Sequence, residues 1–202
     1  DCNLRKALEY HEKSLEIYLD VEVKDKKGVA DACGWIGIIH QDKYFFVADK
    51  LETALAYFQK SLELHLETQD KAGIAWAYHN LGSIYDQTQE YKTALHNYFE
   101  AYLKREQLKS TSLQITKRNI IVLQQKLGRD KFLNYAKEAL ADLSPAQQTA
   151  IHLDDFLELP RTSEKIYKRN DIVKVRYKSG VEKEGKYKKF EKDIKSGKCV
   201  LI

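Results

Sequence analysis

The sequence predicts a mainly α-helical protein, an extended superhelical solenoid of stacked helical hairpins that ends in a small β-rich basic segment. Two recurring elements predict the helical part. The skeleton Asp-Lys-x-Gly, then a β-branched residue and Ala-x-Ala, occurs at residues 25–37 and again at residues 70–85. A second element at residues 6–15 recurs at residues 53–62 and 93–102. Self-similarity at a spacing of about 40 residues, with small residues at fixed places, is typical of stacked helical hairpins.

The bulk composition is typical of a soluble, helix-rich chain: 202 residues, 43% hydrophobic and 32% charged, with nine Gly and two Pro. No apolar run approaches the ~18 residues of a membrane span, and no signal-peptide pattern is visible. Cys2, Cys33 and Cys199 are odd in number and far apart, so they suit neither a disulfide framework nor a zinc site. We expect a cytoplasmic protein with no membrane partner, no metal and no cofactor.

Helical spacing is clearest in the second copy of the first element. Apolar residues recur every three or four positions across residues 75–85, which marks one helix face. The polar residues 87–90 then form a turn, and a second helix follows. Small residues such as Gly82 and Ala94 let the two helices approach closely, and tyrosines such as Tyr98 fill the spaces between hairpins.

These residues resemble the tetratricopeptide repeat, in the variety of that family with a longer pitch of about 40 residues. The positions that match the signature, at the right spacing, are Leu81, Gly82, Tyr85, Tyr91, Ala94, Tyr98 and Ala101. Three copies in phase make the resemblance specific, and it covers roughly 140 residues of the chain.

Residues 1–143 are predicted to form these repeats. Residues 3–21 are the second helix of a first repeat, 27–69 and 71–108 are complete repeats, and a degenerate fourth runs from 111 to 141. In the fourth repeat Ile121 replaces the expected Gly. Because the chain has no methionine and begins inside a repeat, we expect it to be a fragment that lacks its true start, and the number of any upstream repeats stays open.

The second repeat carries about five extra residues between Gly37 and Ala54. One interpretation is a longer hairpin that packs the aromatic residues 44–46 on its neighbours. The other is a protrusion that exposes them to a partner.

Three segments follow the repeats. Residues 144–153 are predicted to be a capping helix, with Ser144 as N-cap and Pro145 at the first helical position. Residues 154–167 are predicted to be a linker. The tail, residues 168–202, is predicted to be a small β-rich basic module.

Alternation at residues 172–178, a Ser-Gly turn signal at 179–180 and a return strand at 182–190 predict a bent antiparallel sheet in the tail. Residues 169–171 and 185–189 faintly resemble the edges of SEC-C zinc-binding tails. The cysteine ligands of that family are missing here, so the resemblance implies no metal site.

No group of residues in the sequence supports a catalytic function. Cys33 and His40 lie seven positions apart on one helical face, but both stand at repeat positions that face the inside of a hairpin. A packed core pair is therefore favoured over a catalytic dyad. The other histidines lack metal-ligand spacing, and no phosphate-binding glycine loop or nucleophile motif appears.

The resemblance implies that the first helices of the hairpins line a concave groove that binds a partner protein or peptide. We therefore predict a non-catalytic interaction scaffold or adaptor. Trp76 is either a partner anchor or a residue that packs against the neighbouring repeat. The groove positions are Asp31, Gly34, Ile38 and Gln41 in repeat two, Trp76, His79, Ser83 and Asp86 in repeat three, and Ile115, Arg118, Val122 and Gln125 in repeat four.

The charge is uneven: residues 168–202 hold 12 Lys/Arg and 5 Asp/Glu, whereas residues 1–167 hold 22 and 25. An alternative function is therefore a factor that binds nucleic acid or another polyanion through this tail. The alternative without a ligand is that these lysines lie on the solvated faces of a small sheet and protect its edges. A further alternative is the sensor part of a larger effector protein. The predicted polyanion-binding residues are Arg176, Lys178, Lys186, Lys188 and Lys189.

Overall fold

A computed structural model of the protein describes residues 2–19, 25–42, 49–157, 172–177, 181–186 and 199–201. The chain divides into two compact units, Asp1–Glu158 and Leu159–Ile202, and each is described by itself. In these ranges no helix combines the length and the apolar character needed to cross a bilayer.

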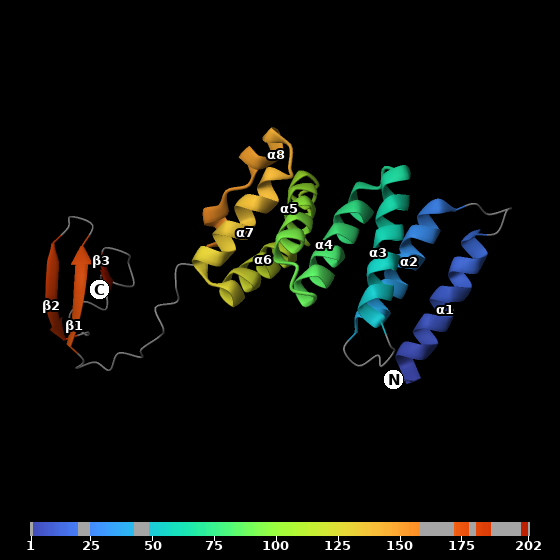
Figure 1. The fold of residues 1–202 in the computed structure, drawn as a ribbon, viewed down its shortest axis with the longest axis horizontal. Coiled ribbons are helices and arrows are strands. Elements are labelled where there is room, and N and C mark those ends of the chain that lie inside the picture. The colour runs from blue at the N-terminus through green and yellow to red at the C-terminus, as the bar shows by residue number, and fades with distance from the viewer. Residues whose placement is uncertain are drawn as a thin grey trace. The chain divides into compact units, whose positions relative to one another are not determined.

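The first unit is a row of helices that lie side by side in chain order (Figure 1). The helices α2 and α3 pack as one antiparallel hairpin, and α4 and α5 pack as the next. The predicted mainly helical, repeated architecture is thereby confirmed. The elements are α1 (Cys2–Leu19), α2 (Lys26–Gln41), α3 (Lys50–Glu67), α4 (Lys71–Gln87), α5 (Tyr91–Gln107), α6 (Leu113–Leu127), α7 (Arg129–Ala141), α8 (Pro145–Ala150) and the 3₁₀ helix η1 (Leu153–Phe156).

The Asp-Lys-x-Gly element starts the first helix of the α2–α3 hairpin and of the α4–α5 hairpin. The side chain of Asp25 accepts a hydrogen bond from the backbone N–H of Gly28 at 3.0 Å, which caps α2. Asp70 caps α4 in the same way, because its Oδ1 accepts from the N–H groups of Ala72 and Gly73 at 3.1 Å. Each cap satisfies donors that the first helical turn leaves unpaired.

The ends of α3, α4 and α5 also share one geometry. Gln69, Gln89 and Lys109, spaced twenty residues apart, have left-handed φ angles of 55°, 65° and 49°. In each case the N–H of the next residue donates to the carbonyl five positions earlier, over 2.8 to 3.0 Å. This Schellman-type ending reverses the chain within a few residues and fixes the turn between successive helices.

A glycine of the first helix meets an aromatic ring of the second helix at the same place in both hairpins. A β carbon built on Gly37 would lie 2.9 Å from Phe58 Cε1, and one built on Gly82 would lie 2.7 Å from Tyr98 Cδ1. Both rings are buried. Any side chain at either position would overlap the ring, so the hairpins need glycine there to close to this distance.

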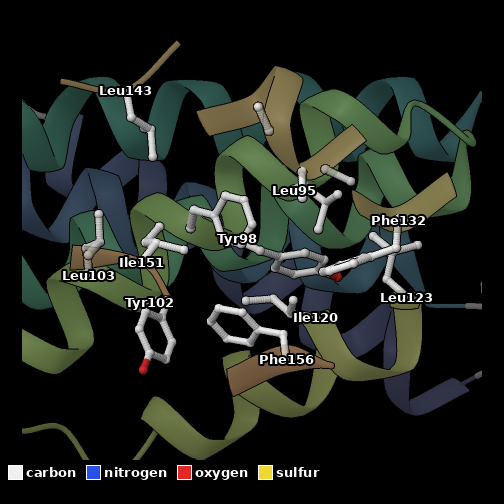
Figure 2. Close-up of a cluster of buried hydrophobic side chains, with 14 residues drawn as sticks. Leu95, Tyr98, Tyr102, Leu103, Ile120, Leu123, Phe132, Leu143, Ile151 and Phe156 are labelled. Carbon is white, nitrogen blue, oxygen red and sulfur yellow. The ribbon is translucent and has the colours of Figure 1, made fainter. Parts of the chain in front are cut away.

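The largest apolar core lies between α5, α6 and α7, and η1 also contributes to it (Figure 2). The ring of Phe156 lies 5.9 Å from that of Phe99 and 5.2 Å from that of Tyr102. Ile121, which replaces the expected glycine in the fourth repeat, is half-buried against this core. Helix α8 buries no side chain of its own, whereas Ile151 just after it is buried. The core therefore extends past the predicted capping helix into the first residues of the predicted linker.

The second unit contains three short antiparallel strands, β1 (Ile172–Tyr177), β2 (Glu182–Lys186) and β3 (Cys199–Leu201), in the order β2-β1-β3. The first strand coincides with the alternating pattern of the sequence. The strands account for only part of residues 168–202, so a β-rich module of that extent stays a prediction. The predicted turn at 179–180, the aromatic insertion at 44–46 and residues 169–171 lie outside the described residues.

We predict that Gly82→Ala lowers the free energy of unfolding by about 1 kcal/mol, because overpacking of ~1–3 kcal/mol exceeds the ~1 kcal/mol by which Ala favours a helix over Gly. Urea unfolding followed by circular dichroism measures this change. In a Tyr98→Leu background the same substitution should cost less, since the ring that it overlaps is gone. A stabilising Gly82→Ala in the wild-type background would contradict the close approach.

Candidate functional site

The first helices of the successive hairpins, α2, α4 and α6, carry the residues that the sequence predicts for the groove. We refer to the side of these helices that bears Trp35, Trp76 and Arg118 as the first-helix face. The structure shows which of its side chains contact neighbouring helices and which are exposed.

Trp76 is half-buried and contacts the preceding hairpin. Its ring centroid lies 5.8 Å from that of Trp35 on α2 and 6.1 Å from that of Phe58 on α3. A β carbon on Gly34 would clash with the indole of Trp76, so the ring lies directly against the α2 backbone. This is the packing alternative raised for Trp76, and its use as a partner anchor stays a prediction.

Polar side chains on α4 bridge to the helices on either side. The amide Nε2 of Gln41 on α2 donates to Ser83 Oγ at 2.7 Å. On the other side, Lys126 Nζ on α6 lies 2.8 Å from Asp86 Oδ1 and 5.1 Å from the centre of the Tyr91 ring. These residues therefore join neighbouring hairpins, a use that sequence reasoning missed because the partners lie about 40 positions apart.

His79 takes part in a third bridge, which is largely buried. Its Nδ1 lies 3.2 Å from Thr116 Oγ1 on α6. The guanidinium of Arg105 donates to the same hydroxyl and, at 3.1 Å, to the carbonyl of Ser112. Arg105 can only donate, so the Thr116 hydroxyl accepts from it, and the proton of that hydroxyl is available to the lone pair of a neutral His79.

The charge state of His79 follows from this position. Burial, and then the charge of Arg105, lower the pKa of His79 from its ordinary value of 6.5 to about 4. The imidazole is therefore neutral at pH 7, which leaves it a lone pair that can accept from the Thr116 hydroxyl. His79 lies on the predicted site, but its described contacts make it an internal link between α4, α5 and α6.

The exposed part of the face includes large apolar side chains. Trp35 on α2 is 50% exposed, and Ile115 and Val122 on α6 are 54% and 49% exposed. Arg118 and Gln125 are also exposed and continue the same stripe of α6, three or four residues apart. Sequence reasoning missed Trp35, and the repeats gave no signal for it, because the equivalent residue of the next repeat, Asn80, is buried.

Cys33 and His40 are both buried, and the ring of His40 stacks on that of Tyr57 at 6.1 Å. Burial raises the pKa of the Cys33 thiol and lowers the pKa of His40. A neutral thiol is a poor nucleophile, so these shifts favour the packing role. Within the described ranges no three His, Cys, Asp or Glu side chains are grouped so that they could hold a metal ion.

The predicted polyanion-binding residues are only partly described. Lys178, Lys188 and Lys189 lie outside the described residues. Arg176 on β1 stands opposite Glu182 on β2, and Lys186 stands opposite Ile172. Binding of a polyanion by this tail stays a prediction.

Comparison with known proteins identifies a repeat family in the middle of the chain. Residues 44–102 match the family model of the tetratricopeptide repeat, over a range that includes α3, α4 and most of α5. No curated protein matches the chain. The match includes Gly82 and Tyr98 of the α4–α5 hairpin and, from the preceding hairpin, the helix α3 that carries Phe58.

We predict that His79 contributes stability that is fully present above about pH 6.5 and is lost as the pH falls towards 4, because the unfolded chain then binds a proton that the folded protein excludes. Between pH 7 and pH 5 the loss is about 2 kcal/mol. Urea unfolding at both pH values, on wild type and His79→Gln, measures it.

The variant keeps an acceptor for Thr116 but does not titrate, so its stability should fall by about 2 kcal/mol less than that of wild type. His40 and His65 titrate in both proteins, so their contributions cancel in the comparison. Equal losses in the two proteins would show that His79 is not held neutral.

Proposed function

From the tetratricopeptide repeats at residues 44–102 we propose that the protein is a non-catalytic interaction scaffold, which binds a segment of a partner protein on the first-helix face of α2, α4 and α6. Repeats of this family support a role in protein–protein interaction in general. The specific face is our proposal.

We choose this face because some of its residues form contacts between hairpins, whereas others are exposed. Ser83 and Asp86 are occupied by contacts between hairpins. By contrast, α6 leaves a continuous exposed stripe with Ile115 and Val122 at its apolar positions. Single exposed apolar residues are ordinary, but two on one stripe beside an arginine suit a mixed apolar and charged peptide.

The bridges also support the proposal because they hold the face rigid before a partner arrives. A preformed surface loses little conformational entropy on binding, and the affinity of a short peptide depends strongly on that term. The partner would contribute apolar side chains towards Ile115 and Val122, and an acidic group towards Arg118.

We predict that the double variant Arg118→Glu, Val122→Asp weakens peptide binding at least about tenfold, which corresponds to ~1.4 kcal/mol or more. The probes are peptides selected from a random display library on the immobilised full chain, and fluorescence anisotropy gives their affinities. The loss is expected because the variant removes an apolar contact and reverses a charge on the α6 stripe.

A matched control is Lys137→Glu, Leu66→Asp. It makes the same two kinds of change at exposed positions of the second helices α7 and α3, and Leu66 is as exposed as Val122. Both variants should keep the wild-type melting temperature within a few degrees, because the changed residues are exposed. Selected peptides that bind the α6 variant as well as wild type, or lose affinity only for the control, would refute the proposal.

A further inference from the structure

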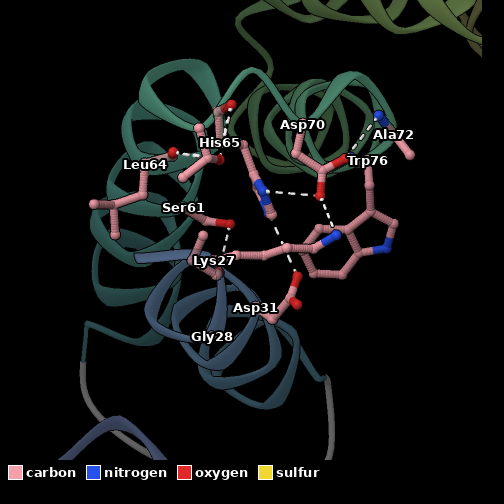
Figure 3. Close-up of polar contacts among 12 residues, drawn as sticks. Lys27, Gly28, Asp31, Ser61, Leu64, His65, Asp70, Ala72 and Trp76 are labelled. Carbon is pink, nitrogen blue, oxygen red and sulfur yellow. Dashed lines mark hydrogen bonds and ion pairs between the residues drawn. The ribbon is translucent and has the colours of Figure 1, made fainter. Parts of the chain in front are cut away.

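A cavity of about 390 Å³ opens where α2, the end of α3 and the start of α4 meet (Figure 3). This volume lies in the ~300–1,000 Å³ range of ligand sites. Lys27, Asp31 and Trp35 contribute from α2, His65 from α3, and Asp70 and Trp76 from the start of the next repeat.

One wall of the cavity is aromatic. It contains both tryptophans of the chain, with ring centroids 5.8 Å apart and planes inclined by 53°. His11 of α1 stacks on Trp35 at 6.0 Å and helps to hold that ring in place. Indole faces attract cations and stack on planar guanidinium groups.

The rest of the cavity carries an excess of negative charge. Asp70 is neutralised, since Lys27 Nζ lies 3.0 Å from its Oδ2 and its other oxygen caps α4. Asp31 is 55% exposed, and among the described side chains it forms no ion pair with Lys or Arg. The carboxylate of Asp31 is therefore the charge that a ligand can neutralise.

His65 is the second, independent sign of a missing ligand group. It is 1% exposed, and neither ring nitrogen has a hydrogen-bond partner. Nε2 lies 3.6 Å from Asp31 Oδ1 and Nδ1 lies 3.7 Å from Asp70 Oδ2, both too long for hydrogen bonds. Figure 3 shows the ring between the two carboxylates.

The ring needs a donor rather than an acceptor. Burial lowers the pKa of His65, and the opposing effect of Asp31 and Asp70 does not cancel that shift, so the imidazole is neutral at pH 7. A neutral imidazole has one N–H and one lone pair, and ionised carboxylates cannot donate to a lone pair. One buried nitrogen therefore lacks a donor: the two carboxylates beside it cannot supply one, and the Lys27 ammonium, the nearby donor, is paired with Asp70.

We propose that this cavity binds an arginine side chain of the partner segment, with the guanidinium donating to Asp31 and to the lone pair of His65 beside the indoles of Trp35 and Trp76. Arginine meets all three requirements, because it is cationic, planar and carries five donors and no acceptor. The inference rests on the proposed function, since the cavity opens at the α2–α4 end of the first-helix face.

The test uses N-acetyl-arginine amide as the probe and the full chain at pH 7.5, with the two indole N–H resonances followed by nuclear magnetic resonance. Because the chain has only two tryptophans and both line the cavity, every indole resonance reports on this site. We expect both resonances to shift saturably, with millimolar affinity (about −4 kcal/mol). The neutral isostere N-acetyl-citrulline amide should shift them far less.

Asp31→Asn should weaken the arginine probe about tenfold or more, because it removes the carboxylate of a charge-assisted pair at an exposed position that tolerates the change. Glu16→Gln on α1 makes the same change in net charge at another exposed residue and should leave the affinity unchanged. No shift with arginine, equal shifts with citrulline, or equal losses in the two variants would overturn the proposal.

The two proposals fail separately. If display-selected peptides bind through the α6 stripe but the arginine probe moves neither indole, only the arginine site is wrong. If the probe binds and depends on Asp31 but no peptide binds the first-helix face, the site stands and the proposed function fails.

Discussion

The structure depends on how closely the two helices of a hairpin approach, and a glycine against an aromatic ring sets that distance. Gly37 with Phe58 and Gly82 with Tyr98 make the same contact in successive hairpins. Because the spacing repeats, α2 and α4 stand in equivalent places, close enough for Gln41 to reach Ser83. A bulkier residue would widen one hairpin and misalign the contacts to the next.

At the junction between two repeats, a few residues each make several contacts. Asp70 caps α4, pairs with Lys27 of the preceding repeat and stands beside His65. Gly73 makes room for the His65 ring, which a β carbon there would overlap. A single turn thus starts a helix, ties two hairpins together and forms the floor of the cavity. The side chains that line such a turn can differ between repeats while the fold stays the same. Repeat families place function at positions that are not needed for packing.

The repeated part of the fold could be predicted because its signals are local. Asp25 and Asp70 mark helix starts, and Gly82 marks the close approach. The site could not be predicted to the same depth. Whether the Asp86 carboxylate is exposed depends on Lys126, forty positions away. No local sequence pattern predicts that these two residues form an ion pair. Trp35 and Trp76 could not be told apart as exposed and half-buried, since that depends on the helix packed against each ring.

The central claim is that partners bind the first-helix face, and photo-cross-linking tests it most directly. A display-selected peptide that carries a benzophenone is cross-linked to the full chain, and mass spectrometry maps the attachment points. The account predicts cross-links within residues 31–41, 76–86 and 115–125. Cross-links confined to α3, α5 and α7, or to the strands β1 and β2, would contradict it.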